Sequence, residues 1–317
     1  MLIYLSMSER ILIVDALNLF IRHYVRNPAM TTNGQHAGGI VGFLNALKSM
    51  VNDIKPTRIF VVWEGGGSSR KRSIYKDYKS QRKPPKMNRF YEDIPDSAEN
   101  KTYQISVLTN VLMNVPVCQI YVPDCEADDV IGYICNNMFH KEQKIIASSD
   151  KDFYQLLSSN IIQYSLSKHE FVTCDDVLKQ FNITSQNFLL AKAICGDASD
   201  NVPGVKNVGF KTLAKRFTCL AEHRDVTLDD ILNECSKLQG IKAAENILNS
   251  VDDIKRNMRL MRLDIANMAA TQVHKVESIC KSFEPFKNKI RMMKLLSDEG
   301  LTSFNAHDFY SSFNNIH

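Results

Sequence analysis

Acidic residues recur at a few places in the sequence, and nine of them are candidate metal ligands. They close the apolar runs ILIVD and FVVWE, follow the runs QIYVP and IIASS, and occur again in GDASDN. The nine are Asp15, Glu64, Glu126, Asp128, Asp129, Asp150, Asp152, Asp197 and Asp200. Crowded carboxylates repel one another, and an oxygen-only ligand set favours hard cations such as Mg²⁺ or Mn²⁺. Two such ions would stabilise the attacking and leaving oxygens of a phosphodiester displacement.

Each of these acids, taken alone, has an ordinary alternative role. Asp or Glu in the first turn of a helix favours the helix dipole without any metal. Their repetition at successive strand ends favours a common site instead. Within CEADDVIG, Glu126 and Asp129 have the spacing of one helix face, whereas Asp128 projects about 100° away from Asp129. Asp150 and Asp152 point the same way if the preceding strand continues through them.

Alternating strand-like and helix-like segments are expected to position these acids. The apolar runs predict strands buried on both faces, and the segments between them have helical periodicity. This pattern predicts an α/β fold with a central, mainly parallel sheet flanked by helices, in which ligand sites form at the carboxyl ends of the strands. After about residue 180 the pattern becomes helical, so we expect two parts, 1–180 and 181–317. The predicted strands are 10–16, 57–64, 117–122 and 144–150.

The composition excludes several classes of protein. A chain of 317 residues, 44% hydrophobic and 23% charged, is typical of a globular protein with one large or two small domains. The net charge of +4, from 39 basic and 35 acidic residues, indicates no partner by itself. The eight cysteines include no C-x-x-C pair, which argues against a zinc or disulfide framework. Without a signal peptide or a membrane-spanning run, we expect a cytoplasmic protein with no membrane contact.

A strongly basic stretch follows Glu64. Residues 70–89 contain nine Lys and Arg residues and one Asp, a local charge of +8 from 9 − 1. Cations suit phosphates, and interleaved tyrosines offer faces to unstacked bases, although a solvated basic loop has the same composition. The candidate nucleic-acid contacts in this stretch are Arg70, Lys71, Arg72, Tyr75, Lys76, Tyr78 and Lys83.

The segment GVKNVGFKT, residues 204–212, predicts a second phosphate-binding element. Two glycines bracket a short turn between helices, and Val205 and Val208 would anchor this hairpin to its own core. It is not a Walker A loop, because Phe210 stands where that motif requires Lys. The candidate contacts to DNA here are Gly204, Val205, Lys206, Gly209, Lys211, Thr212 and Lys215.

Together these motifs resemble those of the 5′ nuclease family, which comprises bacteriophage 5′ to 3′ exonucleases, the 5′-nuclease domain of bacterial family-A DNA polymerases, and flap endonucleases. The similarity extends over about residues 8–220 and is carried by VDALN (14–18), VPDCEADDVIG (122–132), SSDKDFYQL (149–157) and GDASDNVPGVKNVGFKT (196–212). It implies a PIN-like nuclease core with a basic arch at about 68–95. It also implies a helix-hairpin-helix element at about 186–217 that holds duplex DNA, with a K⁺ ion at the hairpin.

The resemblance implies a role for each matching residue. A tighter metal site corresponds to Asp15, Glu126, Asp128 and Asp150, and a second to Asp152, Asp197 and Asp200. Asp129 matches an additional or outer ligand. Lys79 and Arg82 match catalytic arch residues that engage the scissile phosphate, and Tyr75 or Tyr78 would stack on the terminal base. Glu64 departs from the family pattern, which has Asp at this position, and its side chain is longer by one methylene.

We therefore expect a structure-specific nuclease with two Mg²⁺ or Mn²⁺ ions that acts at 5′ flaps, nicks or forks in DNA and on RNA primers paired to DNA, as an RNase H would. It would work in replication or repair, as a monomer, beside a single-strand-binding protein, a clamp or a polymerase. Two alternatives remain open. One is a PIN-type ribonuclease, which the hairpin after GDASDN disfavours. The other is a non-catalytic binder of DNA junctions, with Glu64 as a sign of lost activity.

Overall fold

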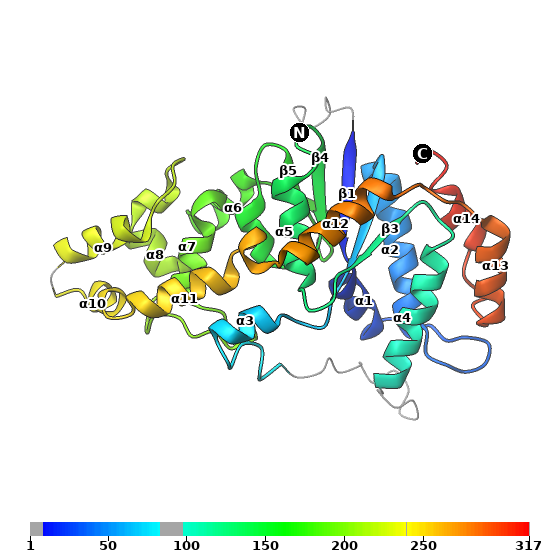
Figure 1. The fold of residues 1–317 in the computed structure, drawn as a ribbon, viewed down its shortest axis with the longest axis horizontal. Coiled ribbons are helices and arrows are strands. Elements are labelled where there is room, and N and C mark those ends of the chain that lie inside the picture. The colour runs from blue at the N-terminus through cyan, green and yellow to red at the C-terminus, as the bar shows by residue number, and fades with distance from the viewer. Residues whose placement is uncertain (1–8, 83–97, 239, 317) are drawn as a thin grey trace.

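A six-stranded sheet forms the centre of the computed structural model, which describes residues 9–82, 98–238 and 240–316 (Figure 1). The strand order is β3-β2-β1-β4-β5-β6, and all neighbours pair in parallel except β5 and β6. The strands are β1 (Arg10–Asp15), β2 (Arg58–Trp63), β3 (Cys118–Tyr121), β4 (Gln143–Ala147), β5 (Ile161–Ser165) and β6 (Glu170–Val172).

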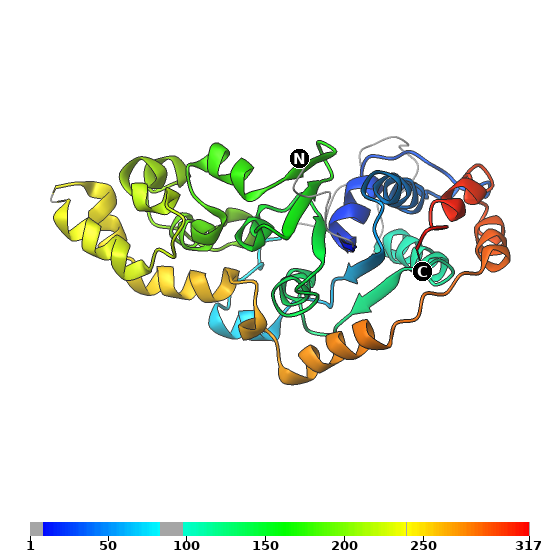
Figure 2. The same cartoon turned by 90° about the horizontal axis from the view of Figure 1, so that it is seen from above.

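Helices cover both faces of this sheet (Figure 2). Successive residues of β1 point to opposite faces: Leu12 joins the core under the first group of helices, and Ile13 joins the core under the second. The first group is α1 (Ala16–Tyr24), α2 (Gly38–Ile54), α4 (Ala98–Leu112), α13 (Lys289–Asp298) and α14 (Ala306–Ser311). The second is α5 (Ala127–Asn137), the 3-10 helix η2 (Lys151–Leu156) and α12 (Ala270–Ser282). The predicted α/β fold with a mainly parallel sheet is confirmed.

Two strands and one turn differ from the sequence prediction. The strands β5 and β6 were not predicted. β4 ends at Ala147, so the strand predicted over 144–150 is too long at its end, and the condition under which Asp150 and Asp152 would point the same way is not met. The chain turns there because polar side chains capture backbone groups: Ser148 Oγ accepts the N–H of Asp150 at 3.1 Å, and Asp150 caps η2 by accepting the N–H of Asp152 at 2.9 Å.

A helical lobe extends from one side of the sheet (Figure 1). Its hydrophobic cluster draws on residues between Ile183 and Ile254 and is separate from the two sheet cores. Val205 and Val208 belong to this cluster, as the sequence predicted for the hairpin. The helices are α6 (Cys174–Phe181), α7 (Ser185–Cys195), α8 (Phe210–Arg216), α9 (Leu228–Lys237), α10 (Lys242–Leu248) and α11 (Val251–Met261), with the 3-10 turns η3 (Ala198–Asp200) and η4 (Thr218–Ala221).

The last part of the chain returns to the sheet. From Leu263, through the 3-10 turn η5 (Ile265–Asn267), it crosses to α12, and Val276 and Cys280 pack in the same core as α5. Met292 of α13 and Phe309 of α14 then join α2 and α4 in the other core. The segment 181–317, predicted as one helical part, is thus divided by its packing between the lobe and the sheet. No helix within the described ranges combines the length and apolar character needed to cross a membrane.

Candidate active site

The carboxyl-terminal edge of the parallel strands gathers the predicted acids. Asp15 is the last residue of β1, Glu64 directly follows β2, and α5 begins after β3 with Glu126 as its N-cap. The helical lobe supplies Asp197 and Asp200 to the same edge, where Asp197 lies close enough to Asp150 to affect its ionisation. The structure therefore brings the nine acids predicted from sequence into one neighbourhood.

Three of these carboxylates, Asp15, Asp128 and Asp150, form a group that we call the unpaired trio, because none of them makes an ion pair in the part of the chain that the structure describes. Burial raises the pKa of Asp15 to about 6, although Asn18 N–H at 3.2 Å and Ser148 Oγ at 2.9 Å donate hydrogen bonds to it. Burial, and then the charges of Asp15 and Asp150, raise the pKa of Asp128 well above its usual range. The ionised form of the trio is thus poorly compensated by the protein.

The other carboxylates around the trio, apart from Glu64, have cationic partners. We call Glu126, Asp129, Asp152, Asp197 and Asp200 the lysine-paired carboxylates. Lys79 Nζ lies 2.6 Å from Glu126 Oε1, and Lys71 Nζ lies 2.9 Å from Glu126 Oε2. Burial alone raises the pKa of Glu126, but these two ammonium groups outweigh it and hold the pKa at about 2.

Lys192 on α7 is a site residue that the sequence analysis missed. Its ammonium makes an ion pair with Asp152 and another, at 2.9 Å, with Asp197 Oδ2. Burial raises the pKa of Asp197, but Lys192 and the hydrogen bonds from Ser199 outweigh it and hold the pKa at about 2. The available signal was a lysine in the otherwise apolar run LLAKAIC, directly before GDASDN.

Glu64, the departure from the family pattern, is engaged by backbone groups. Its Oε1 accepts the N–H of Gly67 at 3.1 Å, and its Oε2 accepts the N–H of Ala127 at 3.3 Å. The turn to Gly67 has a φ of 95°, which favours glycine. Because Ala127 is the first residue of α5, Glu64 caps this helix from the neighbouring strand and adds a negative charge beside Asp15.

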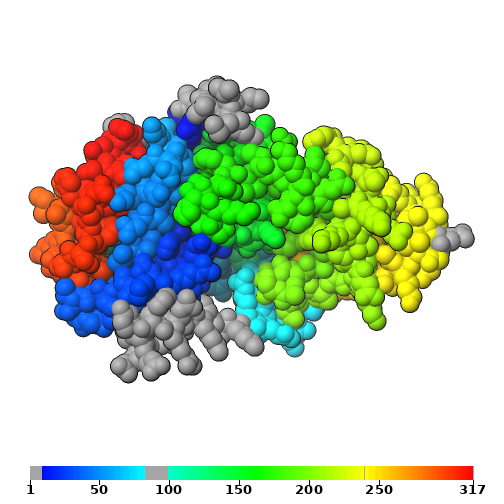
Figure 3. Space-filling view, turned by 180° about the vertical axis from the view of Figure 1, so that it is seen from behind, coloured from blue at the N-terminus to red at the C-terminus, as the bar shows by residue number. Residues whose placement is uncertain are grey.

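The start of the predicted arch packs against the acids. It comprises α3 (Ser69–Ile74) and the turn that follows, and Figure 3 shows this cyan segment beside the yellow-green part of the lobe. The backbone N–H of Lys79 donates to Asp200 O at 2.8 Å, and Arg82 lies 3.1 Å from Asp200 Oδ1. Lys79 and Arg82, predicted as catalytic residues, therefore lie next to the carboxylates.

Four predicted DNA contacts in this stretch need correction or fall outside the description. Lys71 is only 2% exposed and Tyr78 7%, because both point into the acidic cluster, so neither presents a surface to DNA. Tyr75 was predicted to stack on a base, but the guanidinium of Arg256 already lies over its ring, with Cζ 4.5 Å from the ring centre. Lys83 lies outside the described residues. Arg70, Arg72 and Lys76 are exposed.

The helix-hairpin-helix element spans α7, the turn 196–209 and α8. Lys206, Lys211 and Lys215 are exposed on it, and Thr212 is half-buried. Val205 is corrected as a DNA contact, because its side chain is buried and its N–H donates to Ile194 O at 2.8 Å. A Cβ on Gly204 would lie 1.9 Å from Cys195 O, so this glycine permits packing of the hairpin on α7, whereas Gly209 faces open space.

The acids fit a divalent cation by their chemistry. Only carboxylate oxygens are offered, which suits Mg²⁺ or Mn²⁺, and the poorly compensated charge of the ionised trio favours a cation there. In the described part of the chain, however, no three His, Cys, Asp or Glu side chains converge into a complete ligand set. Five of the acids instead make ion pairs with protein cations. These cations are the ammonium groups of Lys71, Lys79 and Lys192 and the guanidinium of Arg82.

Comparison with known proteins decides the family. Residues 10–182, more than half of the chain, match the model of the 5′-3′ exonuclease N-terminal resolvase-like domain. The chain belongs to the 5′-3′ exonuclease family. The resemblance inferred from the sequence is confirmed.

Relatives of this 5′-3′ exonuclease family member cover most of its length. The 5′-3′ exonuclease of Buchnera aphidicola from Schizaphis graminum is 27% identical over 299 residues, which cover 90% of this chain and 96% of the relative. The 5′-3′ exonuclease of Aquifex aeolicus is 32% identical over a region that covers 63% of this chain and 66% of the relative. The solved bacteriophage T5 flap endonuclease, in a pseudo-enzyme-product complex with DNA and metal ions, shares the fold at a TM-score of 0.67 and 20% identity, covering 86% of this chain and 98% of that one.

Proposed function

We propose that this protein is a divalent-metal-dependent, structure-specific 5′ nuclease that hydrolyses phosphodiester bonds in DNA. The observation that carries this proposal is the unpaired trio of acids at the strand edge, next to the start of a basic arch. Membership of the 5′-3′ exonuclease family and the fold shared with the T5 flap endonuclease support it.

The unpaired trio, with Glu126 beside it, would hold the first ion. A divalent cation bound there supplies an activated water and neutralises charge on the phosphate in the transition state. Lys79 and Arg82 now contact Glu126 and Asp200, and from there they would turn to the phosphate oxygens as negative charge develops. Asp152, Asp197 and Asp200 would hold the second ion, Mg²⁺ or Mn²⁺, with Lys192 keeping two of them in place.

Duplex DNA would bind along the hairpin, where Lys206, Lys211 and Lys215 are exposed near one another in sequence. Asn246 Nδ2 donates to Lys206 O at 2.8 Å, which stiffens the hairpin from α10. A K⁺ ion at the hairpin stays a prediction, as do activity on RNA paired to DNA, a monomeric state and contacts with replication proteins. A DNA substrate with a 5′ flap, nick or fork is the form that the arch and hairpin together would select.

The test is cleavage of a 5′-end-labelled flap substrate with Mg²⁺ and with EDTA, beside a nicked duplex and a single-stranded RNA. We expect cleavage of the DNA substrates in Mg²⁺ and none in EDTA. Preferential cleavage of the RNA would favour the PIN-type ribonuclease. Binding of the flap in Mg²⁺ without cleavage would establish a junction binder and contradict the proposal.

A further inference from the structure

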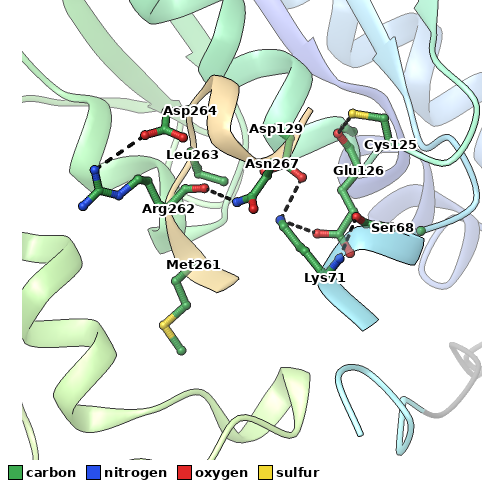
Figure 4. A network of polar contacts seen from close by, with 12 residues as sticks. Ser68, Lys71, Cys125, Glu126, Asp129, Met261, Arg262, Leu263, Asp264 and Asn267 are labelled. Atoms are coloured by element: carbon green, nitrogen blue, oxygen red, sulfur yellow. Dashed lines mark hydrogen bonds and ion pairs between the residues drawn. The ribbon is translucent and has the colours of Figure 1, made fainter. Parts of the chain in front are cut away.

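Lys71 lies at the centre of a buried cluster of charged side chains, next to the carboxyl-terminal edge of the parallel strands (Figure 4). Its ammonium lies 2.9 Å from Glu126 Oε2 and 2.8 Å from Asp129 Oδ2. The three side chains are 2%, 2% and 0% exposed, respectively. A lysine so deeply enclosed cannot reach a DNA phosphate, so its charge acts inside the protein.

The spacing of the two acids places them both on Lys71. Glu126 is the N-cap of α5 and Asp129 lies three residues later, so the two carboxylates share one face of the first helical turn. Asp128, between them, lies instead near Asp15 and Asp150, the other two members of the unpaired trio. In the described part of the chain, neither Asp129 oxygen meets a further hydrogen-bond donor, so Lys71 is the cation in direct contact with it, with Lys79 acting from further away.

Glu126 is held at one oxygen by Lys71 of α3 together with Tyr78 of the arch turn. Its Oε2 accepts from Lys71 Nζ and from Tyr78 Oη, both at 2.9 Å, while its Oε1 contacts Lys79 at 2.6 Å. Oε1 therefore contacts Lys79, whose side chain is more exposed than that of Lys71. Because Oε2 is held by these hydrogen bonds, Oε1 keeps its orientation when the ammonium of Lys79 moves away from it.

The helix that carries Lys71 is itself attached to the loop before α5. Ser68 caps α3 by accepting the N–H of Lys71 at 3.1 Å, and the N–H of Ser69 donates to Asp124 Oδ1 at 2.7 Å. Asp124 and Glu126 belong to the same loop. The start of the arch and the start of α5 are thus joined by contacts on both sides of Lys71.

We propose that Lys71 is a positioning residue for the metal site, because it orients Glu126 as a ligand and compensates the charge of the buried Asp129. In doing so it joins α3, at the start of the arch, to α5. This inference rests on the proposed binding of a divalent ion at the strand edge. Lys71 contacts no reacting atom and acts only through Glu126.

Binding of Mn²⁺ to the full-length protein, measured by calorimetry without DNA, tests this role. If Lys71 acted only as a nearby positive charge, Lys71→Met would bind Mn²⁺ more tightly, because repulsion of the cation is removed. If Lys71 orients Glu126, Lys71→Met binds Mn²⁺ about tenfold more weakly, the loss typical of removing an outer-shell partner. Unchanged or tighter binding by Lys71→Met overturns the proposal.

Two companion variants separate positioning from folding. Lys71→Arg keeps a cation between the carboxylates, and we expect it to restore Mn²⁺ affinity to within about threefold of wild type. Lys71→Met with Asp129→Asn removes the stranded buried carboxylate, so this double variant should regain thermal stability while Mn²⁺ binding stays weak. If the double variant recovers full Mn²⁺ affinity, Lys71 only compensates Asp129 and does not orient Glu126.

Lys144 provides a matched control. It is 1% exposed, as buried as Lys71, but its ammonium donates only to the backbone oxygens of Met138 and Phe139 at 3.1 and 2.9 Å. Lys144→Met should lower the melting temperature and leave Mn²⁺ affinity unchanged, whereas equal weakening in both variants would overturn the proposal. If wild type binds no Mn²⁺ and cleaves no flap, the proposed function itself fails and this inference falls with it.

Discussion

The unpaired trio and the lysine-paired carboxylates are acids at the same sheet edge, yet only the second group makes ion pairs in the described part of the chain. Burial raises the pKa of both groups. In Glu126 and Asp197 the neighbouring lysines overcome that effect and hold the pKa at about 2, whereas in Asp15 the pKa reaches about 6. Burial also outweighs the cations at two paired acids: it raises the pKa of Asp129 to about 6 against Lys71, and raises the pKa of Asp200 against Lys79 and Arg82. Desolvation is thus common to both groups, and cationic neighbours reverse it only at Glu126 and Asp197.

The difference follows from which elements face each group. The trio comes from β1, the loop after β4 and the first turn of α5, and no lysine among the described residues makes an ion pair with it. The paired group faces α3, the arch turn and α7, each of which contributes a lysine. Protein cations therefore contact one half of the site in the metal-free protein, whereas the trio has no such contact.

The largest expected effect is on catalysis, from a change in the trio. Asp150→Asn should reduce flap cleavage by at least about a thousandfold, because losing a metal ligand costs about 4 kcal/mol of transition-state stabilisation. Single-turnover cleavage in Mg²⁺ measures this, and gel shifts in Ca²⁺ should show that DNA binding persists. Retained turnover would contradict the role of the trio.

A change in the paired group should act mainly on stability. Lys192→Met leaves Asp152 and Asp197 without their shared cation, and we expect the free energy of unfolding to fall by about 3 kcal/mol. Urea denaturation measures the loss, and Lys192→Arg is the matched control that keeps the charge. If Lys192→Met is as stable as wild type, the lysine pairing does not hold this half of the site.

The pH dependence of stability should separate the two groups. Because the folded pKa of Asp15 is raised from 3.8 to about 6, its charge destabilises the metal-free protein above pH 6, and lowering the pH from 7 to 5 should stabilise it by about 1 kcal/mol. Glu126 and Asp197 have lowered pKa values, so their contribution is lost only as the pH falls below about 4 toward 2. Denaturant titrations in EDTA check both pH ranges. Asp15→Asn is the control, and its rise between pH 7 and 5 should be about 1 kcal/mol smaller, because only the other acids with raised pKa values, such as Asp128 and Asp129, remain.

The smallest effect is expected outside both groups, at the hairpin. Lys211→Ala should weaken duplex binding and reduce the magnitude of its salt slope by about 0.9, the value for one phosphate contact. Fluorescence anisotropy at several salt concentrations measures the slope, and Lys237→Ala, on α9, is a comparison variant. An unchanged slope would argue against DNA binding by the hairpin.

Much of this arrangement was predictable because it depends on periodicity and spacing. The apolar runs predicted β1 to β4, and the i, i+3 spacing placed Glu126 and Asp129 on one face. The short strand β5 was missed because Gln163 and Ser165 interrupt a run of only five residues. Its pairing with β4, which decides its identity, is a long-range contact.

Charge runs were the poorest guide, because sequence does not tell which member of a run turns inward. Arg70, Lys71 and Arg72 read as equivalent cations, yet α3 exposes the first and third and buries the second. Lys192 was missed for the opposite reason: it is a single lysine within an apolar helix and belongs to no charge run, and only the folded chain brings Asp152 and Asp197 to it.

The most direct test of the account is anomalous diffraction from crystals of this protein soaked in Mn²⁺. The account predicts a Mn²⁺ peak bound by oxygens of Asp15, Asp128 and Asp150, the carboxylates that lack a cationic partner in the described structure. A map with no peak at the trio, in crystals of protein that cleaves flaps in Mn²⁺, would contradict it.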